Sequence, residues 1–309
     1  MAALPPAPEK AYLSQKFARL GFGPYTVQGF SVAGEETVVQ VPELNLLFDL
    51  GRAPQFALNS DLVCLSHGHM DHLAGVAYYL SQRYFQGMKP GTILLPAEIA
   101  EPVDDLLRAW RRVERQETPY ELIPMKPGDM HLVRKDFGIR CHRTHHGGPS
   151  LAFTAIHIRR KLKPEFADKS GEELVKIKAD GTDIQYVLEV PTVTYMGDTG
   201  PGPVWEEPDV RHAQLLLTEC TFFEREHRRK SKAGKHLHAE HLADLLPDLE
   251  NEQIVLLHVS RRTGVPKAKR ILRKLIGDDE MARIHFLMDL KGASAAGDAA
   301  AASAVGEDA

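Results

Sequence analysis

The sequence predicts two packed β-sheets covered by helices on their outer faces. Two observations favour this class. Short apolar runs bounded by glycine, proline and asparagine recur in both halves of the chain, which is typical of strands. Each half also contains helix-period segments of its own, and a sheet that carries helices on one face buries its other face against a second layer. The 309 residues are enough to bury a full core.

The first half is expected to alternate strands with two helices. Turn residues separate the first three strands, and a later apolar run leads into a histidine-rich segment. Apolar residues at helical spacing predict helices at 72–85 and 102–117. The expected strands are 25–32, 36–41, 45–50, 61–66 and 92–96.

The second half is richer in strands. Helices are expected at 239–246 and 266–276, between the last strands. The final stretch, 291–309, is mostly alanine, glycine and serine, which cannot bury a core, so we expect it to be disordered. One catalytic domain is expected over 21–290, after an N-terminal extension over 1–20. The expected strands are 139–143, 151–158, 184–190, 193–196, 214–218, 254–258 and 284–288.

Bulk properties exclude several classes of protein. A formal charge of -4 gives no overall nucleic-acid signature. Cys64, Cys141 and Cys220 stand far apart, so we expect buried thiols in a reducing compartment rather than disulfides or a sulfur-rich zinc site. Neither a secretory signal nor an apolar run of membrane-spanning length is visible. We therefore expect a cytoplasmic protein without membrane segments.

The segment HGHMDH at 67–72 is the strongest indication of chemistry. It places three imidazoles and one carboxylate in six residues, directly after an apolar run. Neutral imidazole nitrogens and carboxylate oxygens suit zinc or a similar first-row cation. His67 and His69 share one face of an extended segment, whereas Asp71 and His72 lie past the bend. The spacing therefore predicts ligands for two metals.

Three further candidate ligands stand at or next to the ends of expected strands. They are His146, Asp198 and His258, each close to an apolar run. Ligands at strand ends share one edge of the sheets, where connecting loops carry function. His145 adjoins His146, and the spacing leaves open which of the two is the ligand.

Several longer motifs point to a known family. Besides HxHxDH, which lies within VCLSHGHMDH at 63–72, they are LNLLFDLGR at 44–52, MKP at 88–90, THH at 144–146 with PS at 149–150, MGDT at 196–199, LTECTF at 217–222, KHLH at 235–238 and LHVSR at 257–261. In these stretches the chain resembles the metallo-β-lactamase superfamily, and within it the ribonuclease Z (tRNase Z) family, most closely the short plant-type form. The resemblance covers most of the chain and implies an α/β fold, the four-layer αβ/βα sandwich of two mixed β-sheets flanked by helices.

The resemblance also implies a metal centre, carried over residue by residue. It implies two Zn²⁺ ions per chain, with Mn²⁺ as a substitute. Alignment with the family's His-x-x-Pro/Gln-Ser pattern favours His146 over His145 as the ligand. The implied ligands are His67, His69 and His146 for the first zinc, Asp71, His72 and His258 for the second, and Asp198 between the two.

The implied activity is that of an endoribonuclease acting on precursor tRNA. Two metals lower the pKa of an attacking water and neutralise phosphate oxygens. By resemblance, Asp71 would hold the proton of that water. His236, oriented by Glu219, would protonate the leaving 3′-oxygen. The products would be tRNA with a 3′-hydroxyl and a trailer with a 5′-phosphate.

Three basic clusters are candidates for contacts to an RNA backbone. They lie around Arg159, Arg228 and Arg261. Phosphate contacts of this kind give affinity without reading sequence. The family resemblance further implies a homodimer, and the apolar face of the helix that carries Trp110 is a candidate for its interface.

Departures from the family concern the substrate side. The start GFGP at 21–24 lacks the FLGTG segment of many bacterial members, and Ala152 and Phe153 replace a frequent glycine and tyrosine. The long glycine- and proline-rich arm that clamps tRNA in other members is expected to be missing. A short charged stretch at 161–183 stands in its place.

Other activities could use the same ligands. A phosphodiesterase for small or cyclic nucleotides, or a thioesterase, could use the same seven metal ligands on the same fold. A catalytically silent RNA-binding protein is a further alternative. Such proteins typically lose metal ligands, whereas every expected position is occupied here.

Overall fold

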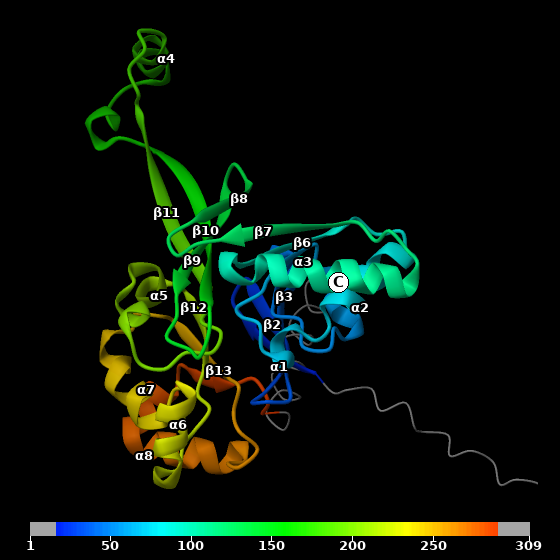
Figure 1. Cartoon of the computed structure of the whole chain (residues 1–309). Helices are drawn as coiled ribbons and strands as arrows, with labels where there is room; N and C mark the ends of the chain where they lie inside the picture. Colours follow the sequence, from blue (N-terminus) through cyan, green and yellow to red (C-terminus); the bar gives the residue numbers. More distant parts are fainter. Residues whose placement is uncertain (1–16, 290–309) are drawn as a thin grey trace, which may run out of the picture.

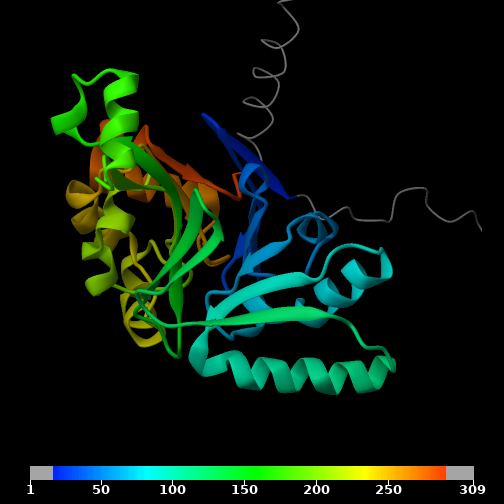
Figure 2. The same cartoon turned by 90° about the horizontal axis from the view of Figure 1, so that it is seen from above.

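Two seven-stranded sheets pack face to face in the computed structural model, which describes residues 17–289 (Figure 1). Seen from above, the two halves lie side by side, with helices on the outside (Figure 2). The first sheet contains β1 (Ala18–Phe22), β2 (Tyr25–Val32), β3 (Glu36–Val41), β4 (Leu46–Phe48), β5 (Leu62–Cys64), β6 (Gly91–Pro96) and β7 (Tyr120–Met125). The second contains β8 (Met130–Arg134), β9 (Phe137–Arg143), β10 (Leu151–Leu162), β11 (Gln185–Tyr195), β12 (Leu215–Glu219), β13 (Gln253–Leu257) and β14 (Ile284–Phe286).

Each sheet is part antiparallel and part parallel. Strands β1 to β4 are antiparallel neighbours, and β4 to β7 are parallel. In the second sheet β8 to β11 are antiparallel and β11 to β14 are parallel. Parallel strands are covered on both faces, and their apolar composition reflects this. Their carboxyl ends meet at one edge, where the loops after β5, β11 and β13 come together.

Helices cover the outer faces of both sheets. Helices α2 and α3 pack on the first sheet through Leu80 and Leu107, and α7 and α8 pack on the second through Leu242 and Leu272. The helices are α1 (Met70–Leu73), α2 (Val76–Phe85), α3 (Ala97–Glu114), α4 (Gly171–Ala179), α5 (Pro208–His212), α6 (Arg228–Gly234), α7 (Ala239–Leu245) and α8 (Val265–Met281).

The central core lies between the two sheets. Phe48 of β4 stacks on Tyr195 of β11, with 4.8 Å between ring centroids, so the sheets are joined through their middle strands. The order helix, sheet, sheet, helix confirms the four-layer sandwich expected from the sequence. The three cysteines are buried free thiols, and burial raises the pKa of each.

Several expected elements have different bounds. The helix expected at 72–85 is two helices, because the Gly75 N–H donates to the Gly51 carbonyl at 2.7 Å instead of to a carbonyl of the preceding turn. A Cβ added at Gly75 would lie 2.4 Å from the Ala53 backbone nitrogen. The helix expected at 102–117 begins at Ala97 and ends at Glu114, where Arg115 takes a left-handed conformation. Strands β1, β7 and β8 and helices α4, α5 and α6 were not expected.

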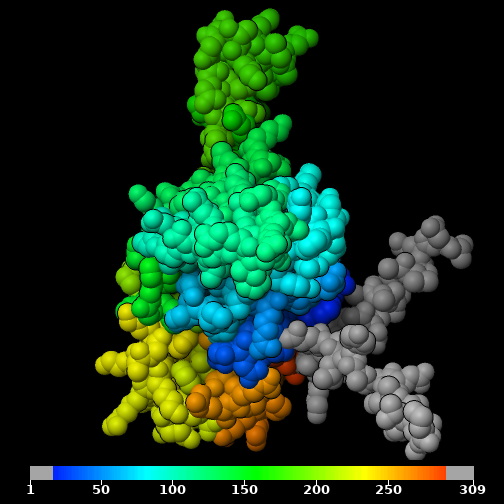
Figure 3. All heavy atoms as spheres, turned by 45° about the vertical axis from the view of Figure 1, so that its right-hand side comes forward, coloured from blue at the N-terminus to red at the C-terminus, as the bar shows by residue number. Residues whose placement is uncertain are grey.

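An arm stands where the sequence predicted only a short charged stretch. Strands β10 and β11 continue their pairing beyond the body of the molecule as far as Leu162 and Gln185. The ribbon ends in α4, whose N-terminus is closed by a capping box of Ser170 and Glu173. Figures 1 and 3 show this arm projecting from the body. The sequence analysis did not predict this arm: a glycine- and proline-rich arm is absent from this stretch, but the charged residues in its place form an arm of their own.

The predicted boundaries are only partly covered by the structure. Residues Ala18 to Leu20, placed in the N-terminal extension, belong to β1. The rest of that extension up to residue 16 and the expected tail over 291–309 lie outside the described residues. Within the described part of the chain, no helix combines the length and the apolar composition needed to cross a membrane.

Candidate metal centre

The predicted ligands converge at the edge of the sandwich where the parallel strands end. The segment at 67–72 follows β5 and runs into α1, and His146 lies in the loop between β9 and β10. Asp198 follows β11, and His258 follows β13 with a positive φ of 55°. Both sheets therefore contribute, and the side chains meet in the space between them.

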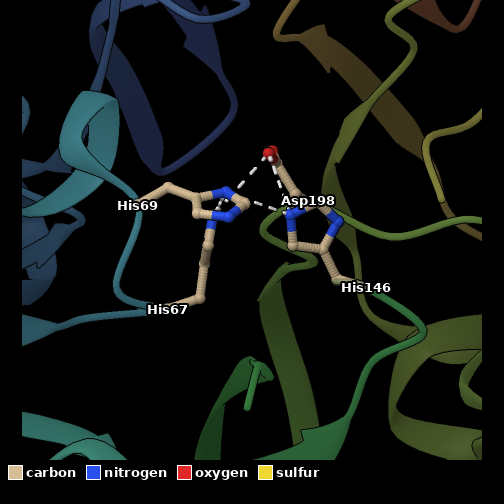
Figure 4. Close-up of side chains that lie close together, drawn as sticks. All are labelled: His67, His69, His146 and Asp198. Atoms are coloured by element: carbon tan, nitrogen blue, oxygen red, sulfur yellow. Dashed lines mark hydrogen bonds and ion pairs between the residues drawn. The ribbon is translucent and has the colours of Figure 1, made fainter. Parts of the chain in front are cut away.

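The first ligand group contains His67, His69, His146 and Asp198. His69 Nδ1 lies 3.0 Å from His67 Nε2 and 3.2 Å from His146 Nε2. The Oδ2 atom of Asp198 lies 3.8 Å from His67 Nε2 and 3.9 Å from His146 Nε2. Figure 4 shows the three rings and the carboxylate pointing toward one another.

The second ligand group contains Asp71, His72 and His258. The Nε2 atoms of the two histidines face Asp71 Oδ2, at 3.7 Å for His72 and 3.4 Å for His258. The same two nitrogens lie 3.5 Å from Asp198 Oδ2. One oxygen of Asp198 therefore faces both groups, the position that a bridging ligand would occupy.

The spacing of these atoms fits bound metal ions. Tetrahedral ligands at about 2.0–2.1 Å from a zinc ion stand about 3.3 Å apart, and the atoms of each group lie within 4.8 Å of one another. His72 Nε2 is buried and has no hydrogen-bond partner among the described residues. Burial would lower the pKa of His72, but the Asp198 and Asp49 carboxylates raise it well above its ordinary value. A divalent cation at Nε2 would lie between this nitrogen and the Asp198 carboxylate, while Asp49 stays on Nδ1.

Buried polar groups orient the candidate imidazole ligands. His72 Nδ1 lies 2.6 Å from Asp49 Oδ2, Ser66 Oγ lies 2.9 Å from His67 Nδ1, and Thr221 Oγ1 lies 3.0 Å from His258 Nδ1. Metal-binding histidines usually use the second ring nitrogen in this way, which fixes the ring and its tautomer. The Nε2 atoms are thereby left to face the candidate ions.

Asp49 is the residue of this network that sequence reasoning missed. It is fully buried and accepts hydrogen bonds from the Ser66 backbone, the Ser66 hydroxyl and the Tyr195 hydroxyl. Its position right after the apolar strand β4, with a positive φ of 54°, was the available signal. Asp49 lay inside a motif used for the family resemblance, but no role was assigned to it.

The electrostatics of the centre favour an ionised Asp198 and a neutral His67, whereas the pKa of His72 is raised. Burial, with the neighbouring His72, holds the pKa of His67 well below its ordinary value. Burial alone would raise the pKa of Asp198, but the His258 and His72 rings opposite hold it well below its ordinary value. Neutral nitrogens with free lone pairs and a carboxylate are the forms that bind cations.

A carboxylate–imidazole pair stands beside the ligands. His236 Nδ1 lies 2.9 Å from Glu219 Oε1 and 3.9 Å from Asp198 Oδ2. Burial would lower the pKa of His236, but the Glu219 carboxylate outweighs this and raises it to about 9. Glu219 is itself fixed by the Thr199 and Leu237 backbone N–H groups. The His236 side chain is 18% exposed, so a substrate can reach it.

The two adjacent histidines after β9 have separate surroundings. His146 is buried in the first ligand group, as the family pattern favoured. His145 is exposed and lines a large cavity next to His236.

The three basic clusters also differ in their surroundings. Arg159 lies exposed on the arm, Arg228 pairs with Glu240 beside that cavity, and Arg261 pairs with Glu35.

Comparison with known proteins decides the family. A beta-lactamase superfamily domain matches residues 45–259. The tRNase Z TRZ1 of Arabidopsis thaliana is 33% identical over 247 residues, which cover 78% of this chain and 87% of that protein. This chain belongs to the tRNase Z family. The chloroplastic tRNase Z TRZ2 of the same plant is 32% identical, covering 81% of this chain and 72% of the relative. A nuclear ribonuclease Z of Triticum aestivum is 34% identical over 54% of this chain and 94% of the relative.

Solved structures agree with the fold. The metallo-beta-lactamase fold protein YhfI of Bacillus subtilis matches with a TM-score of 0.57 at 16% identity. The short form of human tRNase Z matches with a TM-score of 0.55 at 15% identity. Each alignment covers 83% of this chain and 93% of the solved chain. The family and the fold implied by the sequence motifs are thus confirmed.

Proposed function

We propose that this chain is a metal-dependent endoribonuclease that cuts precursor tRNA at its 3′ end. The tRNA would keep a 3′-hydroxyl and the trailer a 5′-phosphate. The observation that carries the proposal is the Asp198 oxygen that faces both ligand groups, with the His236–Glu219 pair beside it, in a member of the tRNase Z family. We propose two Zn²⁺ ions per chain, since imidazole-rich sites with carboxylates suit zinc, and Mn²⁺ as a substitute.

The proposed ligands are those expected from the sequence. His67, His69 and His146 would hold one ion, Asp71, His72 and His258 the other, and Asp198 would contact both. Bound ions would polarise phosphate oxygens and lower the pKa of an attacking water.

Proton handling would rest on residues of the chain. Asp71 Oδ2 accepts a hydrogen bond of 2.9 Å from the Gly34 N–H, which fixes it at the edge of the hollow over the ligands. There it would hold the proton of the attacking water. His236, kept protonated by Glu219, would donate a proton to the leaving 3′-oxygen. Loss of a general acid of this kind costs about 10²-fold or more in rate.

The RNA backbone would be held by the clusters around Arg159, Arg228 and Arg261. The arm cluster is exposed on β10, and the α6 cluster borders the cavity next to His236. Arg262, next to Arg261, lines the hollow over the candidate ligands. Contacts to phosphates at three separated places suit recognition of a folded RNA by its shape.

Relative rates on three substrates test the proposal. We expect kcat/KM on a precursor tRNA to exceed that on bis(p-nitrophenyl) phosphate by several orders of magnitude, and a thioester to be left intact. A tRNA rate no better than the small diester would favour a phosphodiesterase for small or cyclic nucleotides. Turnover of the thioester would favour a thioesterase. The His67→Ala variant, which lacks a proposed ligand, controls for contaminating nucleases.

Location and assembly remain predictions. A cytoplasmic location and a homodimer are the expectations from the sequence, and the relatives include a protein named chloroplastic and one named nuclear. Sedimentation of the purified protein would test the dimer.

A further inference from the structure

We propose that the large cavity beside His236 binds the last nucleoside of the tRNA body, so that the trailer lies on the opposite side of His236. The inference rests on the proposed function. Two hollows meet at this residue. The smaller, of about 260 Å³, contains His69, Asp71, Asp198 and His258. The larger, of about 940 Å³, lies among α6, α7 and the loop after β9. Among the described residues that line them, His236 is common to both.

The direction follows from the chemistry of the leaving group. Hydrolysis breaks the bond between phosphorus and the 3′-oxygen of the tRNA body, water supplies the new oxygen on phosphorus, and the 3′-oxygen takes a proton. The phosphate stays with the trailer. A general acid must lie within hydrogen-bond reach of the oxygen that it protonates. The nucleoside that carries this 3′-oxygen therefore lies on the His236 side, and the phosphate lies over the candidate ligands.

The atoms of His236 support this arrangement. Its Nδ1 is engaged by Glu219 at 2.9 Å, so Nε2 is the atom left for the substrate. One face of the ring stacks on His258 at a centroid distance of 5.3 Å and an interplanar angle of 25°. A nucleoside in the larger cavity would meet the ring from the side that His258 does not cover.

The cavity has groups suited to a nucleotide. Its volume is within the range of ligand pockets. Lys235 Nζ donates to the His146 carbonyl, and Arg228 pairs with Glu240. Lys232 is exposed, and within the described chain no ion pair is found for it, so its ammonium remains for a backbone phosphate. The exposed ring of His145 offers a surface on which a base can stack.

The wall of the cavity is tied to the candidate metal centre. The His145 N–H donates to Thr199 Oγ1 at 3.0 Å, and the Gly200 N–H donates to the His145 carbonyl at 2.9 Å. These bonds join the histidine loop to the segment just after Asp198. The adjacent histidines are thus divided between the two tasks: His146 faces the ligand group and His145 faces the cavity.

Trailer length distinguishes the two sides kinetically. Two precursors would share one tRNA body and carry either a one-nucleotide or a long trailer. We expect Lys232→Ala to lower kcat/KM on both by the same factor, about eightfold at 0.1 M salt for one lost phosphate contact, with a correspondingly weaker salt dependence. Lys274→Ala, an exposed lysine of α8 outside the cavity lining, should leave both rates unchanged. A Lys232→Ala defect confined to the long trailer would overturn the inference.

Photocrosslinking tests the same point directly. The metal-loaded His236→Ala protein would be mixed with precursors that carry 4-thiouridine either at the last nucleotide of the tRNA body or at the first nucleotide of the trailer. We expect the body probe to crosslink to α6 or the His145 loop, and the trailer probe to react elsewhere. The reverse pattern, with normal cleavage by the wild-type protein, would overturn this inference alone. Failure of the wild-type protein to cut either precursor would overturn the proposed function itself, and the inference with it.

Discussion

Replacement of Asp49 by asparagine tests whether the buried network controls metal binding. Asp49 offers two acceptor oxygens: Oδ1 takes the Ser66 N–H at 2.7 Å, and Oδ2 faces His72 Nδ1 at 2.6 Å. Asparagine has one carbonyl oxygen, so in either orientation its NH₂ group faces a donor. If it faces His72, the ring must move its proton to Nε2, and that atom can no longer bind a cation.

The size of the effect follows from these contacts. An unsatisfied buried donor costs about 1–3 kcal/mol, and loss of a group that orients a metal ligand typically costs about 10- to 100-fold in metal affinity. At about 1.4 kcal/mol per factor of ten, the expected loss of binding free energy is about 1.4–2.8 kcal/mol for the ion held by Asp71, His72 and His258. The ion held by the other group should be affected less, because Ser66 rather than Asp49 contacts His67.

Competition with a chelator would measure both affinities in Asp49→Asn and the wild type. Asp209→Asn is the matched control, since Asp209 is a carboxylate paired with Arg140 and His142 away from the ligands. Its loss should leave both metal affinities unchanged. Tyr195→Phe removes only one hydrogen bond to Asp49 and should lower the affinity for the ion held by Asp71, His72 and His258 by less than tenfold. Two ions bound to Asp49→Asn with wild-type affinity would refute the reasoning.

Three further predictions follow from the geometry. His236→Ala should keep its metals and cut precursor tRNA about 10²-fold or more slowly, and lost metal would contradict its assignment. Replacement of the arm residues 163–183 by a short glycine-rich turn should raise KM for precursor tRNA and spare hydrolysis of bis(p-nitrophenyl) phosphate; an unchanged KM would exclude the arm from binding. Burial alone would raise the pKa of Asp209, but its contacts with His142 and Arg140 outweigh burial and hold this pKa below 3.8. Asp209 therefore stabilises the fold above that pH, and urea unfolding should show its advantage over Asp209→Asn shrinking as the pH falls below 3.8.

The candidate ligands were predictable because their spacing is local. Three imidazoles and a carboxylate within 67–72 mark the site in any fold that places a strand before them. His146, Asp198 and His258 stood at or next to apolar runs, and the shared edge of parallel strands brings such residues together. The choice between His145 and His146 came from the family pattern, and the fold gives its physical basis: one ring is buried and the other exposed.

Other features depend on contacts between distant segments. Asp49 and Tyr195 are far apart in the sequence, and their hydrogen bond arises only when the two sheets pack. The arm was missed because its residues are charged. The pairing of β10 with β11, which reaches as far as Leu162 and Gln185, depends on a partner strand across the ribbon rather than on composition. The break at Gly75 likewise depends on a distant segment, because the Gly75 N–H donates to the Gly51 carbonyl.

Mapping the cleavage position on a precursor tRNA tests the central claim most directly. The account predicts one cut, directly after the unpaired nucleotide that follows the acceptor stem, with a 3′-hydroxyl on the tRNA and a 5′-phosphate on the trailer. Asp198→Asn, which alters the carboxylate that faces both ligand groups, should abolish the cut. A precursor left intact in the presence of zinc or manganese would contradict the account, as would cleavage that persists in Asp198→Asn.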